Sequence, residues 1–148
     1  MKITNHIFLG IIFSIFLFFL NFNFSQISIV FLSSILIDGD HYVYYILKRR
    51  NFNLLKCYSW YIENLKRTMR LPMHERKKIY SGFFLFHGIE ILIVLFLLGK
   101  FISPIFIWIG VGFSFHFIVD IFDEIKVKGS YDKSSLIYNL FRFYNTRN

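Results

Sequence analysis

The stretch QISIVFLSSILIDGDHYVYYIL, residues 26–47, decides how this chain folds. It is apolar over the length of about 20 residues that a helix needs to cross a bilayer. Yet it carries Asp38, Asp40 and His41. An ionisable side chain at bilayer depth costs roughly 2.5 to 3.5 kcal/mol, and such residues usually have a function. The stretch therefore predicts a membrane helix that contributes to a polar site.

Three other apolar stretches of similar length surround it. The chain has 148 residues, of which 55% are hydrophobic and 22% aromatic, a composition that suits a lipid-facing protein. The first stretch is followed by Asn21 without a small-residue cleavage pattern, so we interpret it as a retained anchor rather than a signal peptide. We predict one all-α, polytopic membrane domain with four transmembrane helices, at about 3–21, 26–47, 79–98 and 102–123.

The basic residues indicate how these helices are oriented. The segment 48–78 holds ten of the seventeen Lys and Arg residues but only two carboxylates, Glu63 and Glu75. Basic loops face the cytoplasm, and the basic tail 124–148 agrees with this. We expect a multi-pass protein of the inner or plasma membrane with both termini in the cytoplasm. Since topology accounts for the net charge of +8, we expect no nucleic-acid partner.

The basic loop contains an amphipathic pattern. Leu54, Tyr58, Tyr61 and Leu65 recur at helical spacing among Lys and Arg residues, which predicts a cytoplasmic interfacial helix between the second and third spans, ended near Pro72. We favour attraction to membrane lipids with anionic headgroups over docking of a partner protein. The tail, 134–144, has a similar pattern and predicts a second short interfacial helix.

The ionisable residues inside the apolar stretches gather at one depth. At about 1.5 Å per residue, those of the last three stretches lie roughly 10 to 15 Å inward from the cytoplasmic charges. The first stretch begins with its histidine on the same side. This distribution predicts one polar site in the cytoplasmic leaflet, built from His6, Asp38, Asp40, His41, His87, Glu90, His116 and Asp120.

Helical spacing strengthens this prediction. His116 and Asp120 are four residues apart, and His87 and Glu90 are three apart, so each pair should project from one helical face as a two-ligand clip. In the Asp38-Gly39-Asp40-His41 motif, Gly39 should let the backbone bend so that neighbouring side chains approach one ion.

The excess of carboxylates points to a metal. The spans hold no Lys or Arg to neutralise them, and the histidines favour a transition metal, zinc above all with manganese or iron as alternatives, over magnesium or calcium. Two ions fit the number of ligands. The predicted metal ligands are Asp38, Asp40, His41, His87, His116, Asp120 and His6.

Three alternatives stay open. His6 could simply form a hydrogen bond between helices. Glu90 could act as a catalytic base or could orient His87, which is itself either a ligand or a proton donor. The whole set could also form only structural ion pairs and hydrogen bonds.

At these residues the chain resembles the membrane-bound metal-dependent hydrolases, also described as LexA-binding inner-membrane-associated hydrolases. The match rests on His6, Asp38-Gly39-Asp40-His41, His87 and His116-Phe117-Ile118-Val119-Asp120. The chain departs from the family in having Ile37 where a Pro usually precedes the acidic motif. It also lacks the His-Arg and Thr-His-Ser elements around His87, which indicates a divergent member.

The resemblance implies a metal-dependent hydrolase whose site opens to the cytoplasmic leaflet. Its substrate would be a phosphoester or acyl bond in a lipid or in a membrane-proximal molecule. A proton- or metal-ion-coupled transporter is the first alternative, although four helices are few for alternating access unless the chain forms a homo-oligomer. A non-catalytic membrane scaffold is the second alternative.

Overall fold

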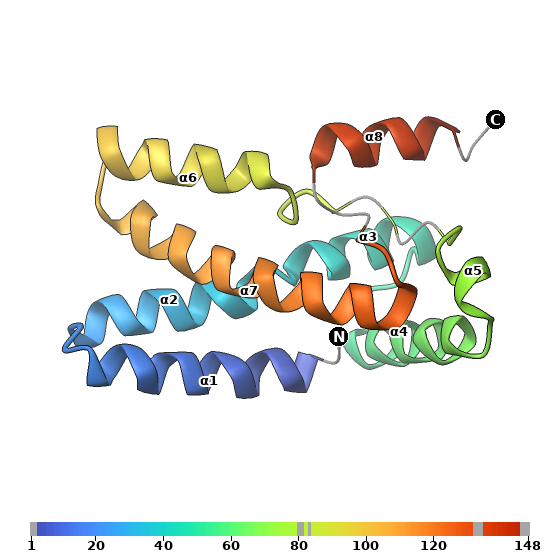
Figure 1. Ribbon diagram of the computed structural model, residues 1–148, viewed down its shortest axis with the longest axis horizontal. Coiled ribbons are helices and arrows are strands. Elements are labelled where there is room, and N and C mark those ends of the chain that lie inside the picture. The colour runs from blue at the N-terminus through green and yellow to red at the C-terminus, as the bar shows by residue number, and fades with distance from the viewer. Residues whose placement is uncertain (1–2, 80–81, 83, 132–134, 146–148) are drawn as a thin grey trace. The chain divides into compact units, whose positions relative to one another are not determined.

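The computed structural model describes residues 3–79, 82, 84–131 and 135–145. These residues form eight helices and no strand, which confirms the all-α prediction (Figure 1). The chain divides into two compact units, one comprising residues 1–37 and 89–121 and the other residues 38–88 and 122–148. Each unit contains histidines and carboxylates of the predicted site.

The first unit contains α1 (Ile3–Phe19), α2 (Phe24–Leu36), α6 (Ile89–Phe101) and α7 (Ile105–Lys128) as far as Ile121. A short turn joins α1 to α2, which runs back antiparallel to it (Figure 1). Asn23 caps α2 by accepting a hydrogen bond from the Gln26 N–H at 3.0 Å, and the Gln26 side chain accepts one from the Asn23 N–H at 3.1 Å. This capping box fixes where the second helix begins.

Small residues let the helices of the first unit approach one another closely. A methyl group at Gly112 of α7 would overlap the Ser33 hydroxyl and the Val30 carbonyl of α2. A methyl group at Gly10 of α1 would lie 3.3 Å from the Ser34 hydroxyl. Close packing through Gly and Ser is typical of helices that associate without a hydrophobic driving force.

The second unit contains α3 (Gly39–Arg49), α4 (Leu54–Met69), α5 (Met73–Arg76), the end of α7 and α8 (Leu136–Asn145). The helix predicted in the basic loop is therefore present as α4, capped by the Asn53 side chain, which accepts from the Lys56 N–H at 3.0 Å. Cys57 of α4 is buried. The guanidinium of Arg76 donates to the carbonyls of Leu71 and Val127 at 2.7 and 3.2 Å.

The second predicted span is not one continuous helix. α2 ends at Leu36 and α3 begins at Gly39, where Gly and Asp lower helix propensity and the Asp40 carboxylate bonds outside its own helix. Gly39 is the first residue of α3, directly after this break, and its φ lies outside the left-handed region, so the break does not depend on a conformation that only glycine adopts.

The third and fourth predicted spans have different limits. α6 starts at Ile89 rather than 79, because Gly82 has a positive φ of 128° and the Phe86 N–H is donated to Asp40. α7 continues past residue 123 and ends at Lys128, and Glu124 and Lys128 form a buried ion pair of 3.2 Å within it. The next residue, Gly129, has a φ of 71° and terminates the helix. Residues 124–128 thus belong to a helix rather than to the tail.

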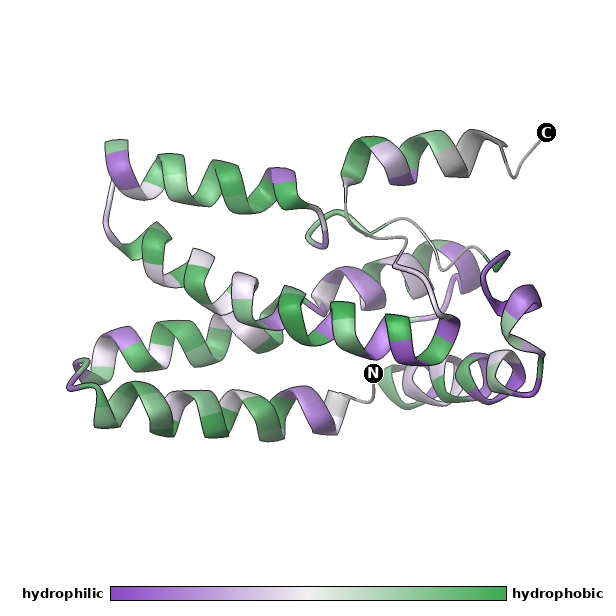
Figure 2. Cartoon of the chain, viewed as in Figure 1, coloured by the Kyte–Doolittle hydropathy of each residue, from purple (hydrophilic) through white to green (hydrophobic). Residues whose placement is uncertain are grey.

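Within the part of the chain that the structure describes, one helix, α7, is long and apolar enough to cross a membrane. α1 has 17 residues and spans about 26 Å, whereas α2 and α6 have 13 each and span about 20 Å, against a hydrocarbon core of about 30 Å. Figure 2 shows that all four helices are nonetheless predominantly apolar. Of the four predicted spans, only α7 has the length and composition of a membrane-crossing helix among the described residues, and the other three stay a prediction.

Polar side chains are buried and apolar side chains are exposed to an unusual degree. Two histidines, His87 and His116, are among the largest fully buried side chains of the described residues. Phe18, Phe19 and Phe24 are 68, 75 and 84% exposed. In water, burying charge is costly and apolar surface tends to be withdrawn from the solvent.

We expect Gly112→Ala to destabilise the protein by about 1 to 3 kcal/mol, because α2 and α7 must separate to admit the methyl group. Thermal unfolding of the metal-free protein in detergent, followed by circular dichroism, measures the loss. Gly39→Ala is the matched control, since its methyl group would meet nothing within 4 Å. Equal melting temperatures for the two variants would contradict the packing described for Gly112.

Candidate metal centres

His6, His116 and Asp120 form a buried cluster in the first unit. His6 comes from the start of α1, and the other two lie one turn apart on α7. His6 Nε2 lies 3.2 Å from one Asp120 oxygen, and His116 Nε2 lies 3.7 Å from the other. Each residue offers one ligand atom, all within 4.8 Å of one another. We call these residues the first cluster.

The spacing of these atoms suits a small divalent cation. Zinc binds nitrogen and oxygen at about 2.0 to 2.2 Å in tetrahedral geometry, so two ligand atoms on one ion are about 3.4 Å apart. The separations of 3.2 and 3.7 Å lie on either side of this value. The imidazole rings of His6 and His116 stack at 4.1 Å with an angle of 10° between their planes, which presents both rings to the same carboxylate.

A backbone carbonyl sets the tautomer of His116. Its Nδ1 lies 2.7 Å from the carbonyl oxygen of Ser34 on α2. A carbonyl oxygen can only accept, so Nδ1 carries the proton, and in the neutral ring Nε2 keeps its lone pair. An outer hydrogen bond of this kind orients histidines that bind metals. Ser34 therefore prepares His116 to bind a cation through Nε2.

Asp38, His41 and His87 form a second cluster, in the second unit. Asp38 immediately precedes α3, His41 lies in its first turn, and His87 lies two residues before α6. Asp38 Oδ1 is 3.6 Å from His41 Nδ1 and 3.8 Å from His87 Nε2. His87 is fully buried, whereas Asp38 and His41 are half-buried. Each again offers one ligand atom within 4.8 Å of the others.

Asp40 joins the two histidines of the second cluster. One of its oxygens accepts from His41 Nδ1 at 2.9 Å, and the other accepts from His87 Nδ1 at 3.0 Å and from the Phe86 N–H at 2.9 Å. The His87 ring is thus protonated on Nδ1 and presents to Asp38 its basic atom Nε2. Asp40 is not among the residues whose ligand atoms converge within 4.8 Å. Its contacts suit a carboxylate that orients the two histidines, and its role as a ligand stays a prediction.

Aromatic side chains enclose the second cluster. The Phe84 ring stacks on His41 with centroids 4.0 Å apart, and the Tyr61 hydroxyl donates to the His41 carbonyl at 2.8 Å. Burial raises the pKa of Tyr61 far above its ordinary value, so this hydroxyl stays protonated as a donor. α4 therefore holds the backbone of the acidic motif in place.

The predicted pair of His87 and Glu90 does not share a helical face, because α6 begins after His87. Glu90 lies half-buried in the first turn of α6, and its catalytic role stays a prediction. His116 and Asp120, by contrast, do lie one turn apart on α7 as predicted, and His6 joins them. The Ser34 carbonyl, the Phe86 N–H and Tyr61 were not foreseen, because none is an ionisable residue within a span.

No model of a known protein family matches the chain, and no curated protein sequence or solved structure matches it either.

We expect the first cluster to bind zinc and to lose it when a ligand is removed. His116→Ala and Asp120→Asn should each reduce the metal content of the purified protein by about one ion per chain, since a catalytic type of zinc site needs three protein ligands. Elemental analysis measures this. His74→Ala is the matched control, because His74 is exposed on α5. Metal contents that are the same in all four proteins would contradict this site.

We expect Asp40→Asn to weaken zinc binding at the second cluster about 10- to 100-fold, because an amide cannot accept from both imidazoles. Competition with a chelator measures the affinity, in a His116→Ala background so that the first cluster does not contribute. Glu75→Gln, which neutralises an exposed carboxylate, should leave the affinity unchanged. An equal loss in both variants would argue for general electrostatics rather than positioning.

Proposed function

We propose that this chain is a membrane-bound, metal-dependent hydrolase that cleaves a phosphoester or acyl bond in a lipid or a membrane-proximal substrate. The observation that carries the proposal is the first cluster, in which two imidazoles and one carboxylate converge within a buried site. Two histidines and a carboxylate form a ligand set that catalytic zinc uses in hydrolases, with a fourth position left for water or substrate.

The residues in and around the first cluster would have different roles in metal binding and catalysis. His6, His116 and Asp120 would hold the ion, and the Ser34 carbonyl would keep His116 in its ligating tautomer. A zinc ion bound there would polarise the bond to be cleaved and lower the pKa of a bound water toward about 7. Glu90, half-buried at the start of α6, is our candidate for the group that accepts the proton of the attacking water.

The distribution of apolar surface supports a position within the membrane. α1 and α6 are as apolar as α7, and α1 exposes a row of large side chains, among them Phe8, Ile15 and Phe16. Lipid would cover this surface, whereas water would not. We propose that all four apolar helices lie in the inner or plasma membrane, with the basic loop 48–78 and both termini on the cytoplasmic side.

The motifs supply the reaction class. The Asp38-Gly39-Asp40-His41 and His116-x-x-x-Asp120 elements are those for which the chain resembles the membrane-bound metal-dependent hydrolases. We propose that the chain is a divergent member, because the same elements supply the ligand atoms of the two clusters. The resemblance names no substrate, so the choice between a phosphoester and an acyl ester is left to experiment.

Turnover of two model substrates tests the proposal. Zinc-loaded protein in detergent should hydrolyse either bis(p-nitrophenyl) phosphate or p-nitrophenyl butyrate, and the substrate that reacts identifies the class of bond. His116→Ala should lower the rate at least about 100-fold, since the residual rate would come without the metal. His74→Ala should keep the full rate. Zinc-loaded, folded protein that turns over neither ester would contradict the hydrolase proposal.

A further inference from the structure

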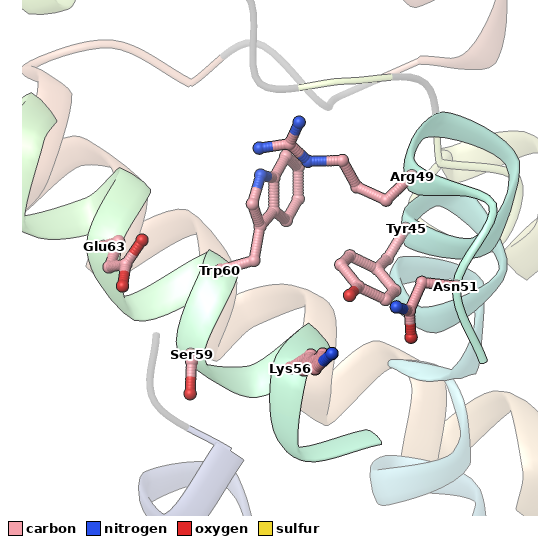
Figure 3. Close-up of a pocket in the computed structure, with 7 residues that line it drawn as sticks. All are labelled: Tyr45, Arg49, Asn51, Lys56, Ser59, Trp60 and Glu63. Carbon is pink, nitrogen blue, oxygen red and sulfur yellow. The ribbon is translucent and has the colours of Figure 1, made fainter. Parts of the chain in front are cut away.

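The second unit contains a polar hollow whose lining includes no residue of either cluster. It has a volume of about 400 Å³ and is lined by residues of α3, by Asn51 in the connection after it, and by residues of α4 as far as Glu63. Figure 3 shows Arg49 reaching from α3 toward the Trp60 ring of α4, with Lys56 and Asn51 below them in the view and Glu63 farther along α4. Neither of the proposed metal centres uses these side chains.

The hollow is lined by one arginine and one lysine, Arg49 and Lys56. Among the described residues neither Arg49 nor Lys56 forms an ion pair, and both are exposed. The Arg49 guanidinium lies 5.8 Å from the centre of the Trp60 ring, and stacking of this kind holds the guanidinium while its N–H groups stay available to a ligand. An arginine presented in this way suits an oxyanion.

Uncharged groups of the hollow also favour an oxyanion as the ligand. The hollow includes the first turns of α4, whose helix dipole places partial positive charge at its N-terminal end. The Asn51 side-chain oxygen accepts from the Asn53 N–H at 2.8 Å, which leaves the amide N–H groups of Asn51 as donors at the rim. Tyr45 is buried and packs against Trp60 with ring centroids 5.7 Å apart, and so forms the base of the hollow.

The charge around the hollow suits a phosphate group. Arg49 and Lys56 contribute two positive charges and Glu63 one negative charge, and the Lys48 ammonium group lies 5.7 Å from the centre of the Trp60 ring, which adds a further positive charge nearby. The Glu63 carboxylate would accept a hydrogen bond from a hydroxyl or ammonium group next to the phosphate. Such a group is present in glycerol and ethanolamine headgroups.

The apolar residues beside the hollow favour a membrane lipid as its ligand. Next to the hollow, Phe52, Leu54 and Leu55 are 75, 65 and 79% exposed. Large apolar side chains beside a polar pocket are where the acyl chains of a bound lipid would lie. We propose that this hollow binds the phosphodiester headgroup of a phospholipid, with Arg49 and Lys56 on the phosphate and Glu63 on the headgroup hydroxyl or ammonium.

Binding of a short-chain lipid to the full-length protein tests the proposal. The probe is monomeric dihexanoyl-phosphatidylglycerol, titrated against protein in a maltoside detergent and followed by tryptophan fluorescence, to which Trp60 contributes from within the hollow. Arg49→Gln combined with Lys56→Gln should raise the dissociation constant about tenfold or more, because two charge-assisted contacts are lost. Lys66→Gln combined with Arg67→Gln removes the same charge from α4 outside the hollow and should change it less than about twofold.

Three results would overturn the proposal. One is an equal loss of affinity in both double variants, which would mean diffuse attraction without a site. Another is unchanged binding in both. The third is equally tight binding of inorganic phosphate, which would make free phosphate the ligand. Zinc content, measured on the same samples, should stay at the wild-type value, so this test stands or falls separately from the hydrolase proposal.

Discussion

The need to satisfy buried imidazoles and carboxylates constrains both units from within. An ionised group away from water is tolerated only when it is paired and hydrogen-bonded. In the first unit this requirement ties α1, α2 and α7 together through His6, Ser34, His116 and Asp120. In the second unit the Asp40 carboxylate accepts hydrogen bonds from His41, from His87 and from the Phe86 N–H. The Phe86 N–H is therefore not available for a regular helix before α6.

The apolar residues then have to face outward. Seven apolar side chains and ten polar or charged ones are buried among the described residues, so polar groups make up much of the interior. In the first unit, Phe8, Phe16 and Phe18 are exposed on α1, a helix that Figure 2 shows as mostly hydrophobic. In water this arrangement would lose the main driving force of folding. In the bilayer that we propose for this chain, the same arrangement would be favourable, because the close contact between Gly112 and Ser33 and polar bonds between helices would supply the association energy.

Local periodicity predicted some parts of this structure and could not predict others. The His116–Asp120 pair follows from the helical repeat alone, and α4 follows from its amphipathic pattern, since both depend on residues near in sequence. The interruption before α6 depends on a bond between Phe86 and Asp40, 46 residues apart, and an apolar window does not reveal such a bond. Likewise, local periodicity does not reveal that Asp40 accepts a hydrogen bond from His87, 47 residues away, and the positioning role suggested for Asp40 depends on that bond.

The single cysteine has a consequence for how the second unit can be studied. Cys57 is buried on α4 next to the residues that line the hollow, and burial raises the pKa of its thiol. A protonated, covered thiol reacts slowly with alkylating reagents. The rate at which Cys57 is alkylated therefore measures local unfolding of α4, and no added label is needed.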